Sequence, residues 1–170
     1  DGTGYSKDPA DSTVEEINSK KGNAKADYNN VSIMSEAENC IQNCIDSFGG
    51  IDILINSAGI ANNRLLFQMS QKDFDTVIDN NLKGMFAPTK FAAILFRQQR
   101  SGRVVNLTSD AGLGEIGKSN NAAASEGIIG LTRTTATDLG KYGVTANAIS
   151  PIAKTRLHDG TVESYLSSEL

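Results

Sequence analysis

The sequence predicts an α/β fold, in which a parallel sheet of about four strands is flanked by helices. Three short apolar runs, at residues 51–55, 104–107 and 144–149, have the length and composition of buried strands. Longer stretches whose apolar residues recur at helical spacing separate these runs. Strands that alternate with helices of ten or more residues indicate βαβ units, and such units build a parallel sheet.

Length and composition indicate a single domain, 1–170, with a substantial core. The chain has 16 basic and 20 acidic residues and no basic run, which argues against a nucleic-acid partner or a membrane surface. No apolar run is long enough to cross a bilayer, and no signal peptide precedes the first element. We therefore expect an intracellular protein that is not secreted and whose ligand is a small molecule.

Two cysteines, Cys40 and Cys44, lie four residues apart among apolar residues. A metal or redox pair is one interpretation, but no second Cys or His cluster accompanies them. We expect buried thiols on one helix face and no metal site. Reduced thiols also fit an intracellular compartment.

The first elements of the chain have weak patterns. Gly2 and Gly4 are too few, and wrongly placed, for a dinucleotide-binding turn, so we interpret them as loop residues. Ser12 and Glu15 have the spacing of a capping box, which predicts a short helix over 12–20. Residues 24–27 are predicted as a weak strand, the fourth of the sheet.

The next helix and strand are clearer. Apolar residues recur at helical spacing over 35–47, and Gly49 with Gly50 stops this pattern before the strand at 51–55.

Two further helices separate the remaining strands. Ser70 and Asp73 are predicted to begin a long helix that reaches residue 96, and Pro88 is predicted to kink this helix or to end its first half. A helix rich in small residues is predicted over 120–138 and is closed by Gly140.

Polar residues follow the strands at their carboxyl ends. Asn56-Ser57-Ala58-Gly59 follows one strand, and Ser109 follows the next. In open α/β sheets the chemistry takes place beyond these ends, so Ser109 is a candidate reactive group. A serine at this position can equally cap a strand end, and the Asn56–Gly59 turn can equally be a simple strand-to-loop turn.

These motifs resemble those of the short-chain dehydrogenase/reductase family. Asn81-Leu82-Lys83-Gly84 and Pro151-Ile152-Ala153-Lys154-Thr155 add to the resemblance, which covers nearly the whole chain in order and spacing. It implies a Rossmann-like sheet, NAD(P) as cofactor and a hydroxyacyl or keto substrate. The branch of peroxisomal multifunctional 3-hydroxyacyl-CoA dehydrogenases is the most similar form, which makes the cytoplasm or the peroxisome the expected compartment.

The resemblance also implies roles for individual residues. Ser109 matches the catalytic serine. Asn81 matches a helix asparagine that helps to hold a water in a proton relay, or that bonds a backbone carbonyl in a kinked helix. The residues implied to border the cofactor are Asn30, Val31, Asn56, Ser57, Ala58, Gly59, Pro151 and Thr155.

The sequence departs from the family at its catalytic pair. Alignment on Gly127–Gly130 places Asn121 where the family has its tyrosine and Ser125 where it has its lysine. A shift by one residue gives Ala122 and Glu126 instead. Neither Asn121 nor Ser125 titrates near neutral pH, so neither can act as the acid or as the cation that lowers its pKa.

A second departure concerns the phosphate site. The family begins with a strand, a Gly-rich turn and a helix whose backbone N–H groups hold the pyrophosphate, and no such segment is found in this sequence. We therefore expect an incomplete, truncated Rossmann-like domain in which NAD(P) binding is weak or absent.

Three functions stay open at this point. The first is oxidoreduction of the family type, impaired or lost. The second is that of a pseudoenzyme that assembles with a complete homologue. The third is a serine-type esterase in which Ser109 is the nucleophile and His158 or Lys118 the base. His158 is the only histidine, and it falls in the loop after the last strand, although a solvated loop position is the ordinary interpretation of both bases.

A homo-oligomer, most simply a two-fold dimer, is also expected. Right-handed crossovers laid down in one direction put all connecting helices on one face of a sheet. The strands nevertheless carry apolar residues on both faces, and a large bare apolar face is unusual in a monomer. The dimer would use that face or the small-residue helix with Ala122, Ala123, Ala124 and Gly127.

Overall fold

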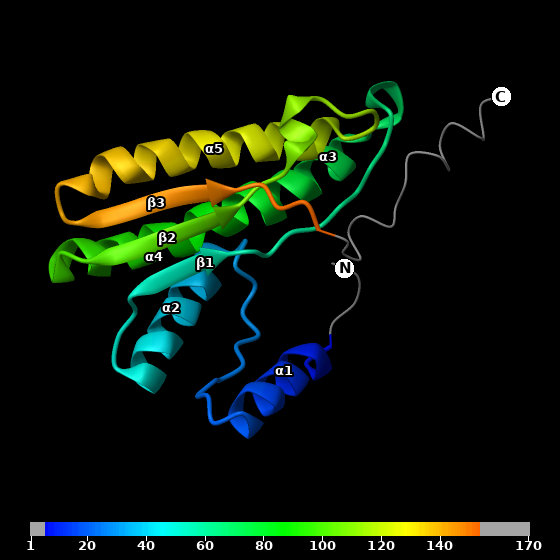
Figure 1. Cartoon of the computed structure of the whole chain (residues 1–170). Coiled ribbons are helices and arrows are strands. Elements are labelled where there is room, and N and C mark those ends of the chain that lie inside the picture. The colour runs from blue at the N-terminus through cyan, green and yellow to red at the C-terminus, as the bar shows by residue number, and fades with distance from the viewer. Residues whose placement is uncertain (1–5, 154–170) are drawn as a thin grey trace.

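The computed structural model describes residues 6–153, and its centre is a three-stranded parallel sheet (Figure 1). The strands are β1 (Ile53–Asn56), β2 (Gly102–Leu107) and β3 (Val144–Ile149), in the order β1-β2-β3. The register pairs Ile55 with Val105, and Val105 with Asn147. The parallel sheet and the three central strand positions are confirmed.

The expected fourth strand at residues 24–27 is wrong. This segment has no regular secondary structure and joins no ladder among the described residues. A strand is stabilised by hydrogen bonds to a neighbouring strand, and within the described residues β1 pairs with β2 alone. The short apolar pattern of the segment therefore does not produce a strand.

The helices occupy the expected regions with shifted ends. They are α1 (Asp8–Ser19), α2 (Met34–Phe48), α3 (Gln71–Val77), α4 (Gly84–Gln99) and α5 (Ser119–Gly140), with 3₁₀ turns at Leu66–Gln68 and Asp110–Leu113. Helix α1 begins four residues before the expected Ser12, because Pro9 suits the first helical turn, where no N–H partner is needed. The predicted capping box at Ser70 and Asp73 is confirmed.

The long helix expected over 70–96 is divided at a place that sequence reasoning did not predict. A π-helical segment, Ile78–Lys83, joins α3 to α4, whereas Pro88 is buried inside α4. Proline has no N–H to bond the carbonyl of residue 84, and its ring crowds that carbonyl. The irregular turn therefore lies just before this point and not at the proline itself.

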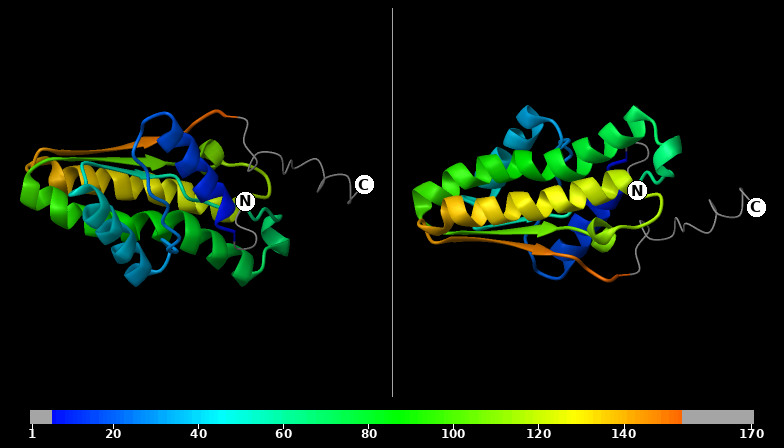
Figure 2. Two further views of the ribbon diagram at one scale, coloured as in Figure 1. Left: turned by 90° about the horizontal axis from the view of Figure 1, so that it is seen from below. Right: turned by 90° about the horizontal axis from the view of Figure 1, so that it is seen from above.

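Helices α2, α4 and α5 cover one face of the sheet, as the one-directional crossovers predict (Figure 2). Their side chains form the apolar core with the inner face of the strands. The fully or largely buried members of this core are Ile41, Ile51, Ala92, Phe96, Val104, Leu139 and Val144. Phe96 and Val104 are 0% exposed and lie at its centre.

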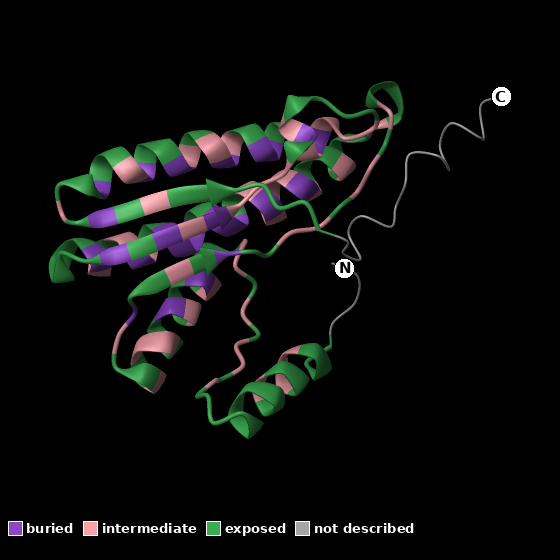
Figure 3. Ribbon diagram, viewed as in Figure 1, coloured by how far each residue is buried: buried purple, intermediate pink, exposed green. Residues whose placement is uncertain are grey.

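The opposite face of the sheet is largely bare. Ile53 and Ile55 of β1 are 58% and 62% exposed, and Ile149 of β3 is 49% exposed. Figure 3 shows β1 and β3 as mostly exposed or intermediate along their length. Helix α1 has no buried residue and does not fill this face.

A chain of buried polar side chains crosses the inner face of the sheet. The Asn56 amide nitrogen donates to Thr89 Oγ1 of α4 (2.9 Å) and to Asn106 Oδ1 of β2 (2.7 Å). The Asn106 amide donates in turn to Thr132 Oγ1 of α5 (2.8 Å), and that hydroxyl donates to the Ile128 carbonyl (2.7 Å). Two strands and two helices are thereby joined by specific hydrogen bonds.

The two cysteines of α2 are free thiols that are partly buried. Burial, and then the negative charge of Asp27 and the neighbouring Cys44, raise the pKa of the Cys40 thiol to about 11. Burial also raises the pKa of Cys44, whose sulfur contacts the Gly50 carbonyl at 3.7 Å. No group of metal-ligating residues that could hold an ion occurs within residues 6–153.

We predict that Cys40 resists alkylation near neutral pH. Only the thiolate reacts, so the rate with iodoacetamide should stay low at about pH 8 and rise steeply towards pH 11. The raised pKa also means that the protonated thiol stabilises the fold below the ordinary thiol pKa, and this stability is lost as pH rises through about 11.

Alkylation of the Cys44→Ala variant, followed by mass spectrometry, isolates the Cys40 rate. Replacing the carboxylate in Asp27→Asn should make Cys40 react faster at the same pH. An equal rate in both backgrounds would show that Asp27 does not influence the thiol.

Candidate functional site

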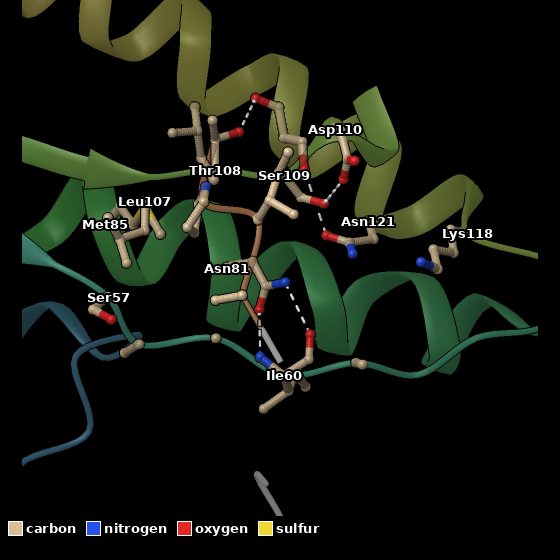
Figure 4. A pocket seen from close by; sticks show the side chains of 18 of the residues that line it. Ser57, Ile60, Asn81, Met85, Leu107, Thr108, Ser109, Asp110, Lys118 and Asn121 are labelled. Carbon is tan, nitrogen blue, oxygen red and sulfur yellow. Dashed lines mark hydrogen bonds between the residues drawn. The ribbon is translucent and has the colours of Figure 1, made fainter. Parts of the chain in front are cut away.

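A cavity of about 680 Å³ opens at the carboxyl ends of the strands. Its wall is formed by the loops that follow the three strands, by the π-helical segment and by the beginning of α5 (Figure 4). Its polar lining residues are Ser57, Asn63, Asn81, Thr108, Ser109, Asp110, Lys118, Asn121 and Ser125. Apolar side chains, among them Ile60, Met85 and Ile128, complete the wall. This is the place at which an open α/β sheet binds its ligand.

Asn81 fastens the loop after β1 to the π-helical segment. Its amide nitrogen donates to the Ile60 carbonyl (3.0 Å), and its amide oxygen accepts from the Ile60 N–H (2.8 Å). Figure 4 shows both bonds on one side of the cavity. The Asn81 side chain therefore bonds the backbone of the loop after β1, and its implied part in a proton relay stays a prediction.

Ser109 caps the short turn that follows β2. Its hydroxyl oxygen accepts from the Ala111 N–H (3.1 Å), and its proton is donated to Asp110 Oδ1 (3.3 Å). The backbone at Ser109 is extended, which suits a residue at the start of a helical turn. The side chain therefore lies in the cavity wall with its proton directed to a carboxylate.

Asn121 and Ser125 occupy the first two turns of α5, on the side that faces the cavity. Ser125 is 1% exposed, and its hydroxyl donates to Asn121 Oδ1 at 3.5 Å. Thr108 at the tip of β2 donates to the Ser125 carbonyl (3.1 Å) and so holds α5 against the strand. Both positions carry neutral side chains next to Ser109.

Asn120 is a structural residue of the site that sequence reasoning missed. It is 0% exposed, and its amide nitrogen donates to the carbonyls of Asn62 (2.7 Å) and Asp73 (3.1 Å). Its amide oxygen accepts from the Asn121 N–H (2.8 Å). The paired asparagines at the start of the small-residue helix were the available signal for this role.

The Asp73 carboxylate completes the support of the cavity mouth. Hydrogen bonds from the Ser70 hydroxyl, then from the Asn62 amide and the Ser70 N–H, lower the pKa of Asp73. The Asn62 amide donates to Asp73 at 2.7 Å, so the loop that carries Asn62 is tied to the start of α3. The loop geometry at the mouth therefore depends on the asparagines as well as on the strands.

Lys118 lies in the cavity wall but is already paired. Its ammonium group forms an ion pair with Glu115, and its side chain is 18% exposed. The backbone of the same loop is joined to the loop after β1, because the Arg64 N–H donates to the Gly117 carbonyl (2.8 Å). Lys118 thus makes an ion pair in the wall and has no hydrogen bond to Ser109.

Of the residues that the sequence predicts to border the cofactor, some line the cavity, some lie elsewhere, and one falls outside the described residues. Ser57, Ala58, Gly59 and Pro151 line the cavity. Asn56, by contrast, is directed into the buried polar chain, while Asn30 accepts from the N–H and the hydroxyl of Ser32 and does not line the cavity.

Val31 likewise lies outside the cavity wall, beside Gly84. Thr155 and His158 fall outside the described residues. No helix in the described part of the chain is long and apolar enough to cross a membrane.

Comparisons with known proteins identify relatives along most of the chain. The family model described as short chain dehydrogenase matches residues 2–163. The 3-oxoacyl-[acyl-carrier-protein] reductase of Synechocystis is 43% identical over 143 residues, which cover 84% of this chain and 58% of the relative. The corresponding FabG reductase of Staphylococcus epidermidis is 41% identical over 147 residues, covering 86% and 60%. The chain thus spans about 60% of the length of these curated relatives.

The peroxisomal hydratase-dehydrogenase-epimerase of Saccharomyces cerevisiae also matches, at 34% identity over 99% of this chain and 19% of the relative. The expected similarity to the peroxisomal branch is therefore found, but the bacterial reductases are more similar in sequence. A crystal structure of a short chain dehydrogenase from Mycobacterium avium superposes with a TM-score of 0.83 at 42% identity, covering 86% of this chain and 53% of that one.

Proposed function

Because the chain belongs to the short chain dehydrogenase family, we propose that it descends from NAD(P)-dependent oxidoreductases of hydroxyacyl or keto compounds and that this activity is impaired or lost. The observation that carries the proposal is the neutral pair Asn121 and Ser125 beside Ser109. Reduction of a carbonyl requires a proton donor of matched pKa next to the reacting oxygen. Among the described residues that line the cavity there is no tyrosine, histidine or cysteine.

The substrate class follows from the relatives. Those from Synechocystis and Staphylococcus epidermidis are named as reductases of 3-oxoacyl groups, and the cavity combines apolar side chains with hydrogen-bonding groups, as such a group requires. We propose a 3-oxoacyl or 3-hydroxyacyl thioester as the ligand. The matched segment covers 58–60% of these two reductases, so the proposal concerns this segment and its cavity.

The residues of the cavity suit the nicotinamide end of NAD(P) but not its pyrophosphate. Ser57, Ala58, Gly59 and Pro151 line the cavity where the resemblance places the nicotinamide, whose chemistry would be hydride transfer. The lining residues include one cation, Lys118, and it is paired with Glu115, so the wall offers little to a pyrophosphate. We therefore propose that NAD(P) binds weakly or not at all.

We predict no measurable oxidation of NADH or NADPH with acetoacetyl-CoA. Without an acid at position 121, the developing alkoxide stays unprotonated, and removing general acid catalysis costs about 10²- to 10⁴-fold in rate. The absorbance of the reduced nicotinamide, followed with micromolar protein, provides the measurement. Asn121→Tyr combined with Ser125→Lys should not restore turnover by itself, because the phosphate site is not rebuilt.

Turnover that survives both Asn121→Ala and Ser125→Ala would contradict this proposal. It would show that another group supplies the proton. The Ser109→Ala variant then tells whether the activity belongs to this cavity.

The esterase alternative has weaker support. The Ser109 proton is donated to the Asp110 carboxylate and not to either base that this alternative names: Lys118 is paired with Glu115, and His158 lies outside the described residues. Two results would support the esterase alternative. Hydrolysis of p-nitrophenyl acetate should disappear in Ser109→Ala, and the increase of its rate near neutral pH should disappear in His158→Ala.

We further propose a two-fold homodimer, which could join bare sheet faces or the small-residue side of α5. Ile53, Ile55 and Ile149 leave an apolar surface on the sheet face that no described helix covers. Such a pseudoenzyme could equally assemble with a complete homologue. The intracellular compartment, cytoplasmic or peroxisomal, stays part of the proposal and is supported by the free thiols Cys40 and Cys44.

We predict a mass of about twice 18.0 kDa in light scattering at micromolar concentration. If the sheet face is the interface, Ile55→Lys should shift the protein to the monomer, since a buried lysine there would lack a partner. Lys90→Glu, on the exposed side of α4, provides a charge-change control outside the sheet. A monomer at all concentrations would remove this part of the proposal.

A further inference from the structure

The cavity contains several hydrogen-bond donors, but most of them are committed to the protein. The Asn81 amide nitrogen donates to the Ile60 carbonyl, and the Thr108 hydroxyl donates to the Ser125 carbonyl. The Ser109 proton is donated to Asp110. A ligand in this cavity can therefore take a hydrogen bond from the Thr108 or Ser109 hydroxyl only by breaking an existing one, and the Asn81 amide nitrogen has one of its two N–H groups in use.

The amide of Asn121 differs from these groups. Its oxygen accepts the proton of the Ser125 hydroxyl, and its nitrogen makes no hydrogen bond to another described residue. Figure 4 shows the amide close to Ser109, with its oxygen on the dashed line and its nitrogen on the other side. Asn121 thus presents two N–H protons from the wall of the cavity.

Ser125 contacts the amide oxygen of Asn121 and contributes to the orientation of the amide. The Ser125 side chain is 1% exposed and lies one helical turn after Asn121. An amide rotated by half a turn would place its nitrogen against the hydroxyl and its oxygen in the cavity. Donation from Ser125 to the amide oxygen favours the observed orientation, so Ser125 is a positioning residue for Asn121.

We propose that the Asn121 amide nitrogen binds the oxo group of the ligand, so that the cavity recognises a ketone as a neutral hydrogen-bond acceptor. This inference rests on the proposed function and specifies which atom of the thioester is recognised. An amide N–H can donate a hydrogen bond to a carbonyl oxygen but does not transfer its proton at neutral pH. The ketone is bound and left unreduced.

The chemical difference between a ketone and an alcohol provides a sharp test. A ketone oxygen only accepts hydrogen bonds, whereas a hydroxyl can also donate one. Asn121→Asp keeps the shape of the side chain and replaces its donor by an acceptor. The substitution should therefore weaken binding of the 3-oxo compound and leave binding of the 3-hydroxy compound nearly unchanged.

The measurement is calorimetric titration of the full chain with acetoacetyl-CoA and with 3-hydroxybutyryl-CoA. In Asn121→Asp we expect the dissociation constant of acetoacetyl-CoA to rise about tenfold or more. The ketone oxygen loses one hydrogen bond and faces a carboxylate oxygen, which repels it. The constant for 3-hydroxybutyryl-CoA should change less than about threefold. Both ligands carry the same CoA charge, so repulsion from the new carboxylate affects them equally and cancels in the ratio.

Ser125→Ala provides a second variant that adds no charge. The freed amide can rotate, so affinity for the ketone should fall about two- to fivefold while affinity for the alcohol is retained, since the amide oxygen can accept from a hydroxyl. Asn23→Asp, in the exposed stretch between α1 and α2, is the matched charge control and should leave both constants unchanged.

If Asn121→Asp and Ser125→Ala each weaken the binding of both thioesters by the same factor, the inference is overturned. The proposed ligand class would then stay in place. If neither thioester binds to the unmodified chain, the proposed function fails and the inference fails with it. Steady conversion of one ligand into the other in the presence of NAD(P)(H) would contradict the bound-but-unreduced state.

Discussion

The hydrogen bond between Asn56 and Asn106 is the interaction on which the rest of this structure depends. It joins β1 to β2 through side chains, in a region where the backbone ladder already pairs the same two residues. Asn106 is 0% exposed and Asn56 is 6% exposed, so an amide without a partner here would be costly. The hydroxyls of Thr89 in α4 and Thr132 in α5 accept hydrogen bonds from the amide nitrogens of Asn56 and Asn106. Each helix therefore has one favoured position against the sheet.

This fixed packing positions the cavity. Asn106 lies two positions before Thr108 in β2, and Thr132 lies two turns after Ser125 in α5. The hydrogen bond between Asn106 and Thr132 therefore sets the distance between the tip of β2 and the beginning of α5. Thr108 then bonds the Ser125 carbonyl, and Asn120 holds the loops at the mouth. These contacts support the cavity, and the side chains at Asn121 and Ser125, next to Ser109, are a neutral amide and a neutral hydroxyl.

Much of the fold could be predicted from the sequence because its signals are local. The strand at 144–149 and the helix at 35–47 follow from apolar periodicity and from the glycines that end it. The failures have nonlocal causes. Residues 24–27 have a strand-like pattern but no neighbouring strand to pair with. The π-helical turn arises from the combination of Pro88 with the bonds between Asn81 and Ile60, and that loop contact is not encoded by spacing.

The site was predicted in part for the same reason. The strand ends locate Ser109 and the Ser57–Gly59 turn at the cavity. The roles of Asn56 and Asn120 depend on partners that are 33 to 58 residues away in the sequence, so their burial could not be inferred from neighbouring residues.

A double-mutant cycle on the buried amides tests the central claim most directly. The free energy of unfolding in urea would be compared for the unmodified chain, Asn56→Ala, Asn106→Ala and the double variant. We predict a coupling energy of about 1–2 kcal/mol, because the first substitution already removes the partner of the second. Costs that add to within about 0.3 kcal/mol would contradict the account, since the two amides would then stabilise the fold independently.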